Sequence, residues 1–155
     1  MIALSPSKLT YLIGDATYPV GDGLKIIAHI TNDANKWGAG FVLAISKRWS
    51  EPEAMYRSMT KRTVGKVQLV QVESDIVVAN MIAQYGVGTR PDGRPPISYG
   101  GVRLALNEVN QYARKNNATI HMPRIGCGLA GGDWNEMERI IKAVMSVDVF
   151  VYDLK

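Results

Sequence analysis

The sequence is poor in cysteine, in long apolar runs and in targeting features, and each shortage excludes a class of protein. Cys127 is the only cysteine among 155 residues, so an internal disulfide cannot form, and no Cys/His spacing suits a zinc site. No run of roughly 18 or more apolar residues offers a membrane span. Met1–Leu12 lacks the charged start, apolar centre and small-residue cleavage site of a signal peptide. We therefore expect a cytoplasmic protein with no metal, no cofactor and no membrane partner.

Positive charge exceeds negative charge, but it is scattered along the chain. The net charge is +4 and the pI is about 9.2. The densest basic cluster, residues 61–66 (KRTVGK), falls where a turn is expected and has no interleaved aromatic residues that could stack on bases. A small basic nucleic-acid-binding protein is an alternative that rests on charge alone, and its binding should weaken steeply with salt. We expect no nucleic-acid partner.

With 46% hydrophobic residues and no internal repeats, the chain predicts one globular domain, residues 1–155. Short apolar runs bounded by turn residues predict strands at Leu9–Ile13, Lys25–Ile30, Val67–Val72, Ile76–Ala83, Thr119–Met122 and Val147–Tyr152. Apolar residues at helical spacing, together with helix start signals, predict helices at Gly40–Trp49, Glu51–Thr60, Tyr99–Asn116 and Trp134–Val144. The third and fourth strands are close enough to form a hairpin.

Strands that alternate with helices and are apolar on both faces predict a three-layer α/β/α fold with a central mixed sheet. In such sheets ligands bind at the carboxyl ends of the strands. The loops after Ile13, Ile30 and Met122 are therefore the candidate binding loops. The segment Gln84–Tyr99, rich in proline and glycine, is long for a compact domain and is a candidate lid.

Two glycine-rich loops follow predicted strands and lead into predicted helices. One is the run 126–132 (GCGLAGG) and the other is 37–40 (WGAG). Glycines let successive backbone N–H groups turn inward, and such a nest beside the positive end of a helix binds phosphate without needing a lysine. Either loop alone could simply allow tight packing, but both stand at expected carboxyl edges, so together they predict a diphosphate site.

Three segments carry a resemblance that extends over nearly the whole chain: residues 14–17 (GDAT), 28–32 (AHITN) followed by 38–40 (GAG), and 123–129 (PRIGCGL). They resemble the macro domain, the ADP-ribose-binding fold. The branch that the chain most resembles contains the terminal ADP-ribose protein glycohydrolases and the ADP-ribose-1''-phosphate processing enzymes. The resemblance implies that the chain binds ADP-ribose or its 1''-phosphate, with ADP-ribosylated protein as a further candidate partner.

The resemblance also implies roles for single residues. Asp15 would accept a hydrogen bond from the adenine amino group, Ala16 would offer its backbone N–H, and Tyr152 would stack on adenine. The distal ribose and the diphosphate would be held by Asn32, Gly38, Ala39, Gly40 and Phe41 on one side and by Ile125, Gly126, Cys127, Gly128 and Leu129 on the other. Alternatives remain for three of these: Asp15 could simply form a turn that ends a strand, Phe41 could pack in the core, and Tyr152 could be buried.

The catalytic candidates are Asn32, His29 and Asp133, the first two because they would be the polar groups nearest the distal ribose. Asp133 has a competing role, because an Asp followed three residues later by Glu136 is a capping-box pattern at a helix start. Where the glycohydrolase branch has a catalytic carboxylate, this chain has Ala130. Cys127 as a nucleophile is disfavoured, because no His or Asp stands at a recognisable spacing from it.

Gln84 is the second departure from that branch, which carries a lysine at the matching position and uses it to form a covalent adduct with the sugar. An amide cannot form a Schiff base with the opened ribose. Two hypotheses follow. The chain hydrolyses ADP-ribose-1''-phosphate or a related ADP-ribose ester, or it is a reader module that binds ADP-ribose without chemistry.

Overall fold

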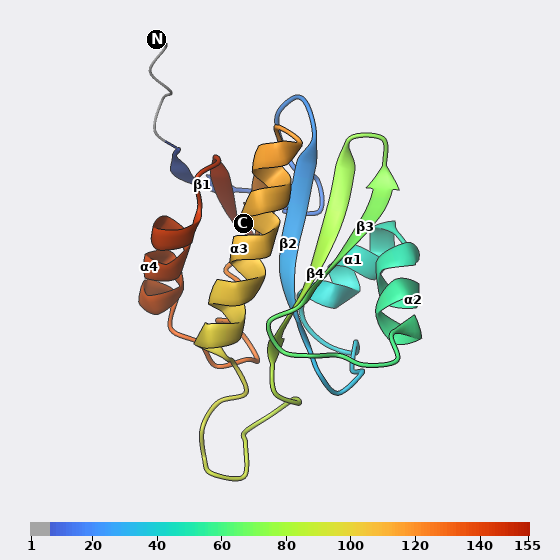
Figure 1. The fold of residues 1–155 in the computed structure, drawn as a ribbon, viewed down its shortest axis with the longest axis vertical. Coiled ribbons are helices and arrows are strands. Elements are labelled where there is room, and N and C mark those ends of the chain that lie inside the picture. The colour runs from blue at the N-terminus through green and yellow to red at the C-terminus, as the bar shows by residue number, and fades with distance from the viewer. Residues whose placement is uncertain (1–6) are drawn as a thin grey trace.

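The computed structural model describes residues 7–155, which form six strands and four helices (Figure 1). The strands are β1 (Leu9–Ile13), β2 (Lys25–Asn32), β3 (Val67–Glu73), β4 (Ile76–Gln84), β5 (Thr119–Met122) and β6 (Val149–Asp153). The helices are α1 (Phe41–Arg48), α2 (Glu51–Ser58), α3 (Tyr99–Lys115) and α4 (Trp134–Val144). Every predicted element is present.

One six-stranded sheet runs through the middle of the fold in the order β1-β6-β5-β2-β4-β3. All neighbouring strands pair in parallel except β3, which pairs antiparallel with β4 as the predicted hairpin. The sheet is therefore mixed, as expected. Because five strands point the same way, their carboxyl ends share one edge, at the lower end of the view in Figure 1.

Helices cover both faces of the sheet and complete the predicted three layers. On β2, Ile26 and Ala28 belong to the core cluster under α3 and α4, whereas Ile27 belongs to the cluster under α1 and α2. Successive strand residues point to opposite faces, so a strand covered on both sides must be apolar throughout. This is why the central strands read as continuous apolar runs.

Element boundaries differ from the expectation by a few residues, for identifiable reasons. β2 continues to Asn32 because its pairing with β4 extends to Gln84. α1 begins at Phe41 because Gly40 has φ 83°, which is not helical.

The two ends of the segment after β4 lie close together, because the Tyr85 N–H donates to the Pro96 carbonyl at 2.9 Å. Across residues 7–155, none of the helices combines the length and apolar character that crossing a membrane requires.

Candidate functional site

The amino end of α1 has no capping side chain. Its N-cap, Gly40, has no side chain to accept a hydrogen bond, and the first turn carries no acidic residue. Within residues 7–155, no acceptor is found for the N–H groups of Ala39, Gly40 and Phe41. By contrast, α3 and α4 are capped by the side chains of Ser98 and Asp133. The positive end of the α1 dipole, with its unsatisfied donors, is thus available to an anion.

The loop after β5 forms a second row of free donors. Gly126 has φ +72°, and a Cβ on Gly132 would lie 2.5 Å from the Gly126 carbonyl oxygen, so both glycines are needed for the loop to close. Gly128 differs, because a Cβ there would meet no atom within 4 Å. The N–H groups of Gly128, Leu129 and Ala130 have no acceptor in the part of the chain that the structure describes. This loop therefore presents backbone donors to open space.

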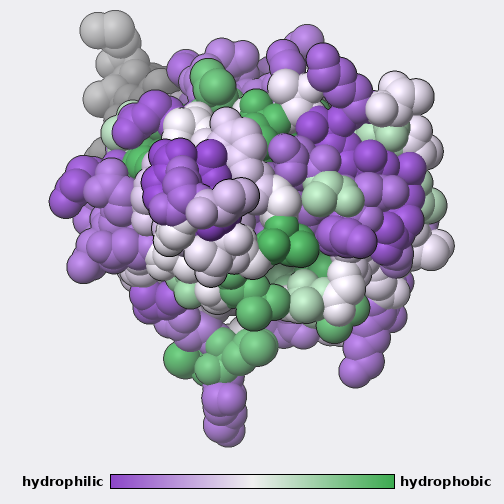
Figure 2. All heavy atoms as spheres, turned by 90° about the horizontal axis from the view of Figure 1, so that it is seen from below, coloured by the Kyte–Doolittle hydropathy of each residue, from purple (hydrophilic) through white to green (hydrophobic). Residues whose placement is uncertain are grey.

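These two rows face one another across a cavity of about 210 Å³. It is lined by His29, Ile30, Ala39, Gly40, Phe41, Gln84, Pro123, Arg124, Ile125, Gly126, Gly128, Leu129 and Ala130. A second cavity of about 350 Å³ adjoins it and shares four of those residues, and its lining adds Thr31, Asn32, Lys36, Gly38, Val42, Val87 and Gly88. Figure 2 looks onto this end of the molecule, where apolar groups lie between hydrophilic areas. The two cavities form one elongated cleft.

Asp15 and Ala16 stand at the carboxyl end of β1, outside the lining of both cavities. Asp15 Oδ1 accepts hydrogen bonds from the Thr17 N–H at 2.9 Å and from the Thr17 hydroxyl at 2.7 Å. Among the described residues, no donor reaches Asp15 Oδ2. The turn alternative and the adenine role are therefore compatible, since one carboxylate oxygen holds the turn and the other is free. Its contact with adenine stays a prediction.

Tyr152 is the residue whose expected role the structure does not support. It is only 4% exposed. Its hydroxyl accepts a hydrogen bond from the Val20 N–H at 2.9 Å and lies 2.7 Å from Nδ1 of His121. Because the ring is enclosed, it offers no face on which adenine could stack, and the buried alternative is the one found. The partners that enclose Tyr152 are distant in sequence, which is why strand alternation alone left both readings open.

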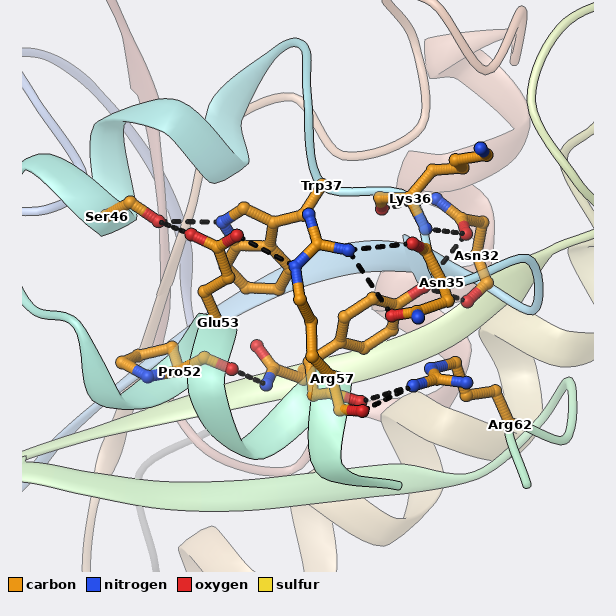
Figure 3. A network of polar contacts seen from close by, with 11 residues as sticks. Asn32, Asn35, Lys36, Trp37, Ser46, Pro52, Glu53, Arg57 and Arg62 are labelled. Carbon is orange, nitrogen blue, oxygen red and sulfur yellow. Dashed lines mark hydrogen bonds and ion pairs between the residues drawn. The ribbon is translucent and has the colours of Figure 1, made fainter. Parts of the chain in front are cut away.

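Asn32 lines the second cavity, but its side chain already serves the fold (Figure 3). Its Oδ1 accepts hydrogen bonds from the N–H groups of Ala34 and Lys36 and from the Tyr56 hydroxyl, at 2.8–3.1 Å. Its Nδ2 donates to the Lys36 carbonyl at 2.9 Å. The amide therefore shapes the turn that leads into Trp37 and the following glycines. The second Nδ2 hydrogen has no acceptor among the described residues, so Asn32 can donate one hydrogen bond to a ligand without losing these bonds. Its role at the reacting sugar stays a prediction.

His29 lines the first cavity, yet it is 1% exposed and neutral. Burial lowers its pKa to about 4. Its Nε2 lies 2.6 Å from Oδ1 of Asn80, and the Asn80 Nδ2 donates to Pro52 O and Gln68 Oε1. Asn80 Oδ1 must therefore accept, which places the proton on Nε2 and leaves Nδ1 unprotonated. So low a pKa makes His29 a weak base near neutral pH.

Asp133 and Cys127 are explained without catalysis. Asp133 Oδ1 accepts from the Asn135 N–H at 2.9 Å and so caps α4, while the Asp133 N–H donates to the Tyr99 hydroxyl instead of to Glu136. The capping prediction is confirmed for Asp133 but wrong for its reciprocal partner. Asp133 lines neither cavity. Burial raises the pKa of the Cys127 thiol, so it stays protonated and is a poor nucleophile.

Gln84, which the sequence places where the related branch has a lysine, lines both cavities and donates to the Gly86 carbonyl at 2.9 Å. Two further cleft residues had no predicted role, and one of them, Lys36, lines the second cavity. Arg124 lines the first. It stands inside the quoted PRIGCGL motif, and Lys36 immediately precedes the WGAG loop, so position was the only available signal. No Asp or Glu lines either cavity, and residues 7–155 contain no cluster of three side chains that could hold a metal ion.

Solved structures with this fold cover nearly the whole chain. A protein of unknown function from Bacteroides thetaiotaomicron is 49% identical, covers 95% of this chain and 98% of its own, and superposes with a TM-score of 0.92. A macrodomain protein from Streptomyces coelicolor is 42% identical over 94% of this chain and 99% of its own, with a TM-score of 0.82. Thermosipho africanus DarTG, solved in complex with ADP-ribose, shares the fold at 15% identity, with a TM-score of 0.74 over 97% of this chain and 43% of its own.

Curated relatives are more distant in sequence. The ADP-ribose glycohydrolase OARD1 of Bos taurus is 26% identical over 96% of this chain and 93% of its own length. Chromodomain-helicase-DNA-binding protein 1-like is 26% identical in Mus musculus and 30% in Danio rerio, over 96% and 88% of this chain. The chain spans only 18% and 14% of those two proteins. No protein-family model matches it.

Proposed function

The chain belongs to the macrodomain family, and on this premise we propose that it binds ADP-ribose in the cleft described above. The diphosphate lies between the free N–H groups of residues 39–41 and those of residues 128–130. The distal ribose occupies the second cavity, and adenine lies toward Asp15. The observation that carries this proposal is the pair of unsatisfied donor rows that face each other across one cavity.

Backbone donors explain how an anion is held where no lysine stands between the two walls. N–H groups at a helix start and in a glycine loop bind phosphate through hydrogen bonds and through the helix dipole. The DarTG structure contains ADP-ribose, which supports this choice of ligand for the fold. The small basic nucleic-acid-binding alternative has no matching feature in the cleft.

Isothermal titration calorimetry tests this proposal. Wild-type protein is titrated with ADP-ribose, and separately with a single-stranded oligonucleotide, at low and at physiological salt. We expect saturable one-to-one binding of ADP-ribose and at most weak, strongly salt-dependent oligonucleotide binding. Tighter binding of the oligonucleotide, or no heat with ADP-ribose at millimolar concentration, would overturn the proposal.

A second candidate function is hydrolysis of ADP-ribose-1''-phosphate or a related ADP-ribose ester. It is supported by the relative named ADP-ribose glycohydrolase and by the second cavity, where Lys36 and Gln84 would flank a substituent on the distal ribose. No carboxylate lines the cleft, so water would attack without an adjacent Asp or Glu as general base. Phosphate release from ADP-ribose-1''-phosphate tests this candidate. Binding of ADP-ribose-1''-phosphate without release of phosphate would instead support the reader module.

Gln84 predicts that any turnover proceeds without a covalent lysine adduct. The neutral amide can hydrogen-bond the distal ribose but cannot attack its anomeric carbon. Borohydride added during incubation with ADP-ribosylated protein should therefore trap no adduct in wild type, as read by intact-mass spectrometry. A trapped adduct would contradict this, and repeating the experiment with Lys36→Ala would show whether the nearby lysine in the second cavity had formed it.

A further inference from the structure

The planar guanidinium group of Arg124 is held in one orientation. Its Nε and Nη2 donate to the two carboxylate oxygens of Asp153 at 2.6 and 2.9 Å. The guanidinium carbon lies 5.1 Å from the centroid of the Tyr11 ring and 5.2 Å from that of Trp134. Those rings are themselves joined, because Trp134 Nε1 donates to the Tyr11 hydroxyl at 2.9 Å. Two hydrogen bonds and two rings therefore set the orientation of one guanidinium.

This plane stands between the diphosphate wall and the turn that carries Asp15. The Arg124 backbone leads into the glycine loop after β5, and Arg124 lines the first cavity. Its partner Asp153 ends β6 and pairs in register with Ile13 of β1. The Asp153 carbonyl accepts the Gly14 N–H at 2.8 Å, one residue before Asp15. Arg124 thus lines the cavity proposed for the diphosphate and is joined through Asp153 to the turn that carries Asp15.

The aromatic residue expected to stack on the base, Tyr152, is enclosed, whereas the Arg124 side chain is 42% exposed. Guanidinium groups are planar and stack on aromatic faces. Resting on the proposed function, we infer that the guanidinium of Arg124 is the platform on which the purine of the bound nucleotide stacks, while Asp15 reads its edge. Stacking is indifferent to ring substituents, so affinity and base selectivity reside in different residues.

Four variants and two ligands test this inference by calorimetry, and the fourth variant is Asp15→Ala. Arg124→Ala removes the plane, and Arg124→Lys keeps the charge without it. Arg139→Ala is the matched control, because Arg139 is an exposed arginine of α4 whose ion-pair partner among residues 7–155 is Glu136. The ligands are ADP-ribose and its analogue with hypoxanthine in place of adenine. Thermal melts establish that each variant is folded, and Arg124→Lys serves if Arg124→Ala is not.

We expect both Arg124 variants to bind ADP-ribose about ten-fold more weakly, with the preference for adenine over hypoxanthine unchanged. Asp15→Ala should abolish that preference, and Arg139→Ala should bind like wild type. Wild-type affinity in Arg124→Lys would assign a purely electrostatic role, and loss of base preference in either Arg124 variant would assign a structural one. Either result overturns the inference. Failure of the wild type to bind ADP-ribose would instead overturn the proposed function.

Discussion

Replacement of Gly128 by glutamate should weaken ADP-ribose binding strongly and leave the fold intact. A Cβ at this position meets no atom within 4 Å, and the φ of Gly128 lies outside the left-handed region, so the backbone here accepts a side chain without strain. Its carboxylate would enter the cavity proposed to hold the diphosphate. Two unit charges about 5 Å apart repel by about 3 kcal/mol at an effective dielectric constant of about 20, which corresponds to about a hundred-fold in affinity.

Gly132→Ala is the matched control in the same loop. There a Cβ would lie 2.5 Å from the Gly126 carbonyl oxygen, which is backbone and cannot move aside freely. Forced overlap of this kind costs about 1–3 kcal/mol, and a domain of this size loses about 2–4 °C of Tm per kcal/mol. Gly132→Ala should therefore lower the Tm by roughly 2–12 °C, whereas Gly128→Glu should leave it close to the wild-type value.

The two variants are compared by differential scanning calorimetry and by titration with ADP-ribose. The reasoning fails if folded Gly128→Glu binds ADP-ribose within a factor of three of wild type, because the loop would then not hold the diphosphate. It also fails if Gly128→Glu melts as early as Gly132→Ala, because the position would then be structural. Gly128→Ala should fall between wild type and the glutamate variant in affinity, with an unchanged Tm.

Three further outcomes are expected. Asp15→Ala should weaken ADP-ribose binding by about 1–3 kcal/mol by removing a charge-assisted hydrogen bond; equal affinities in calorimetry would contradict the adenine role. Tyr152→Phe should lower the free energy of unfolding by about 1–3 kcal/mol, because His121 Nδ1 and the Val20 N–H lose their partner; an unchanged urea midpoint would refute this. Burial lowers the pKa values of His29 and His121 to about 4 in the folded protein. Between pH 6.5 and 4 the unfolded chain therefore binds more protons than the folded protein. As the pH falls through that window, the free energy of unfolding should decrease by up to about 1.4 kcal/mol per pH unit for each histidine. A flat urea profile from pH 7 to 4.5 would count against it.

The fold could be predicted because its signals are local. Strands such as β2 and β4 are buried on both faces, so each appears in the sequence as a nearly uninterrupted apolar run. The helices show their buried stripe at helical spacing. Boundaries were less predictable, since the last residues of β2 are strand only because β4 continues beside them. Pairing between distant segments has no signature in either segment alone.

The position of the site could be predicted from the sequence, but the contacts of its individual side chains could not. The glycine loops after β2 and β5 were found from composition, and the structure brings them to opposite walls of one cavity. Side-chain contacts could not be predicted where the decisive partner is remote in sequence. Asn32 is held by Tyr56, 24 positions away, and Tyr152 lies against His121, 31 positions away. Arg124 has its partner Asp153 at a separation of 29.

Hydrogen-bonding capacity separates the groups that build this site from those that can serve a ligand. Asn32 Oδ1, one Asn32 Nδ2 hydrogen and Asp133 Oδ1 already serve the fold, and recruiting these atoms for catalysis would cost about 1–3 kcal/mol for each group left unsatisfied. The donor rows at residues 39–41 and 128–130 have no partner to lose among the described residues, so an anion can bind there with little reorganisation. The cleft is therefore organised for binding first. Any hydrolysis falls to a bound water and to Gln84 and Lys36, the polar side chains that line the second cavity beside Asn32 and Thr31.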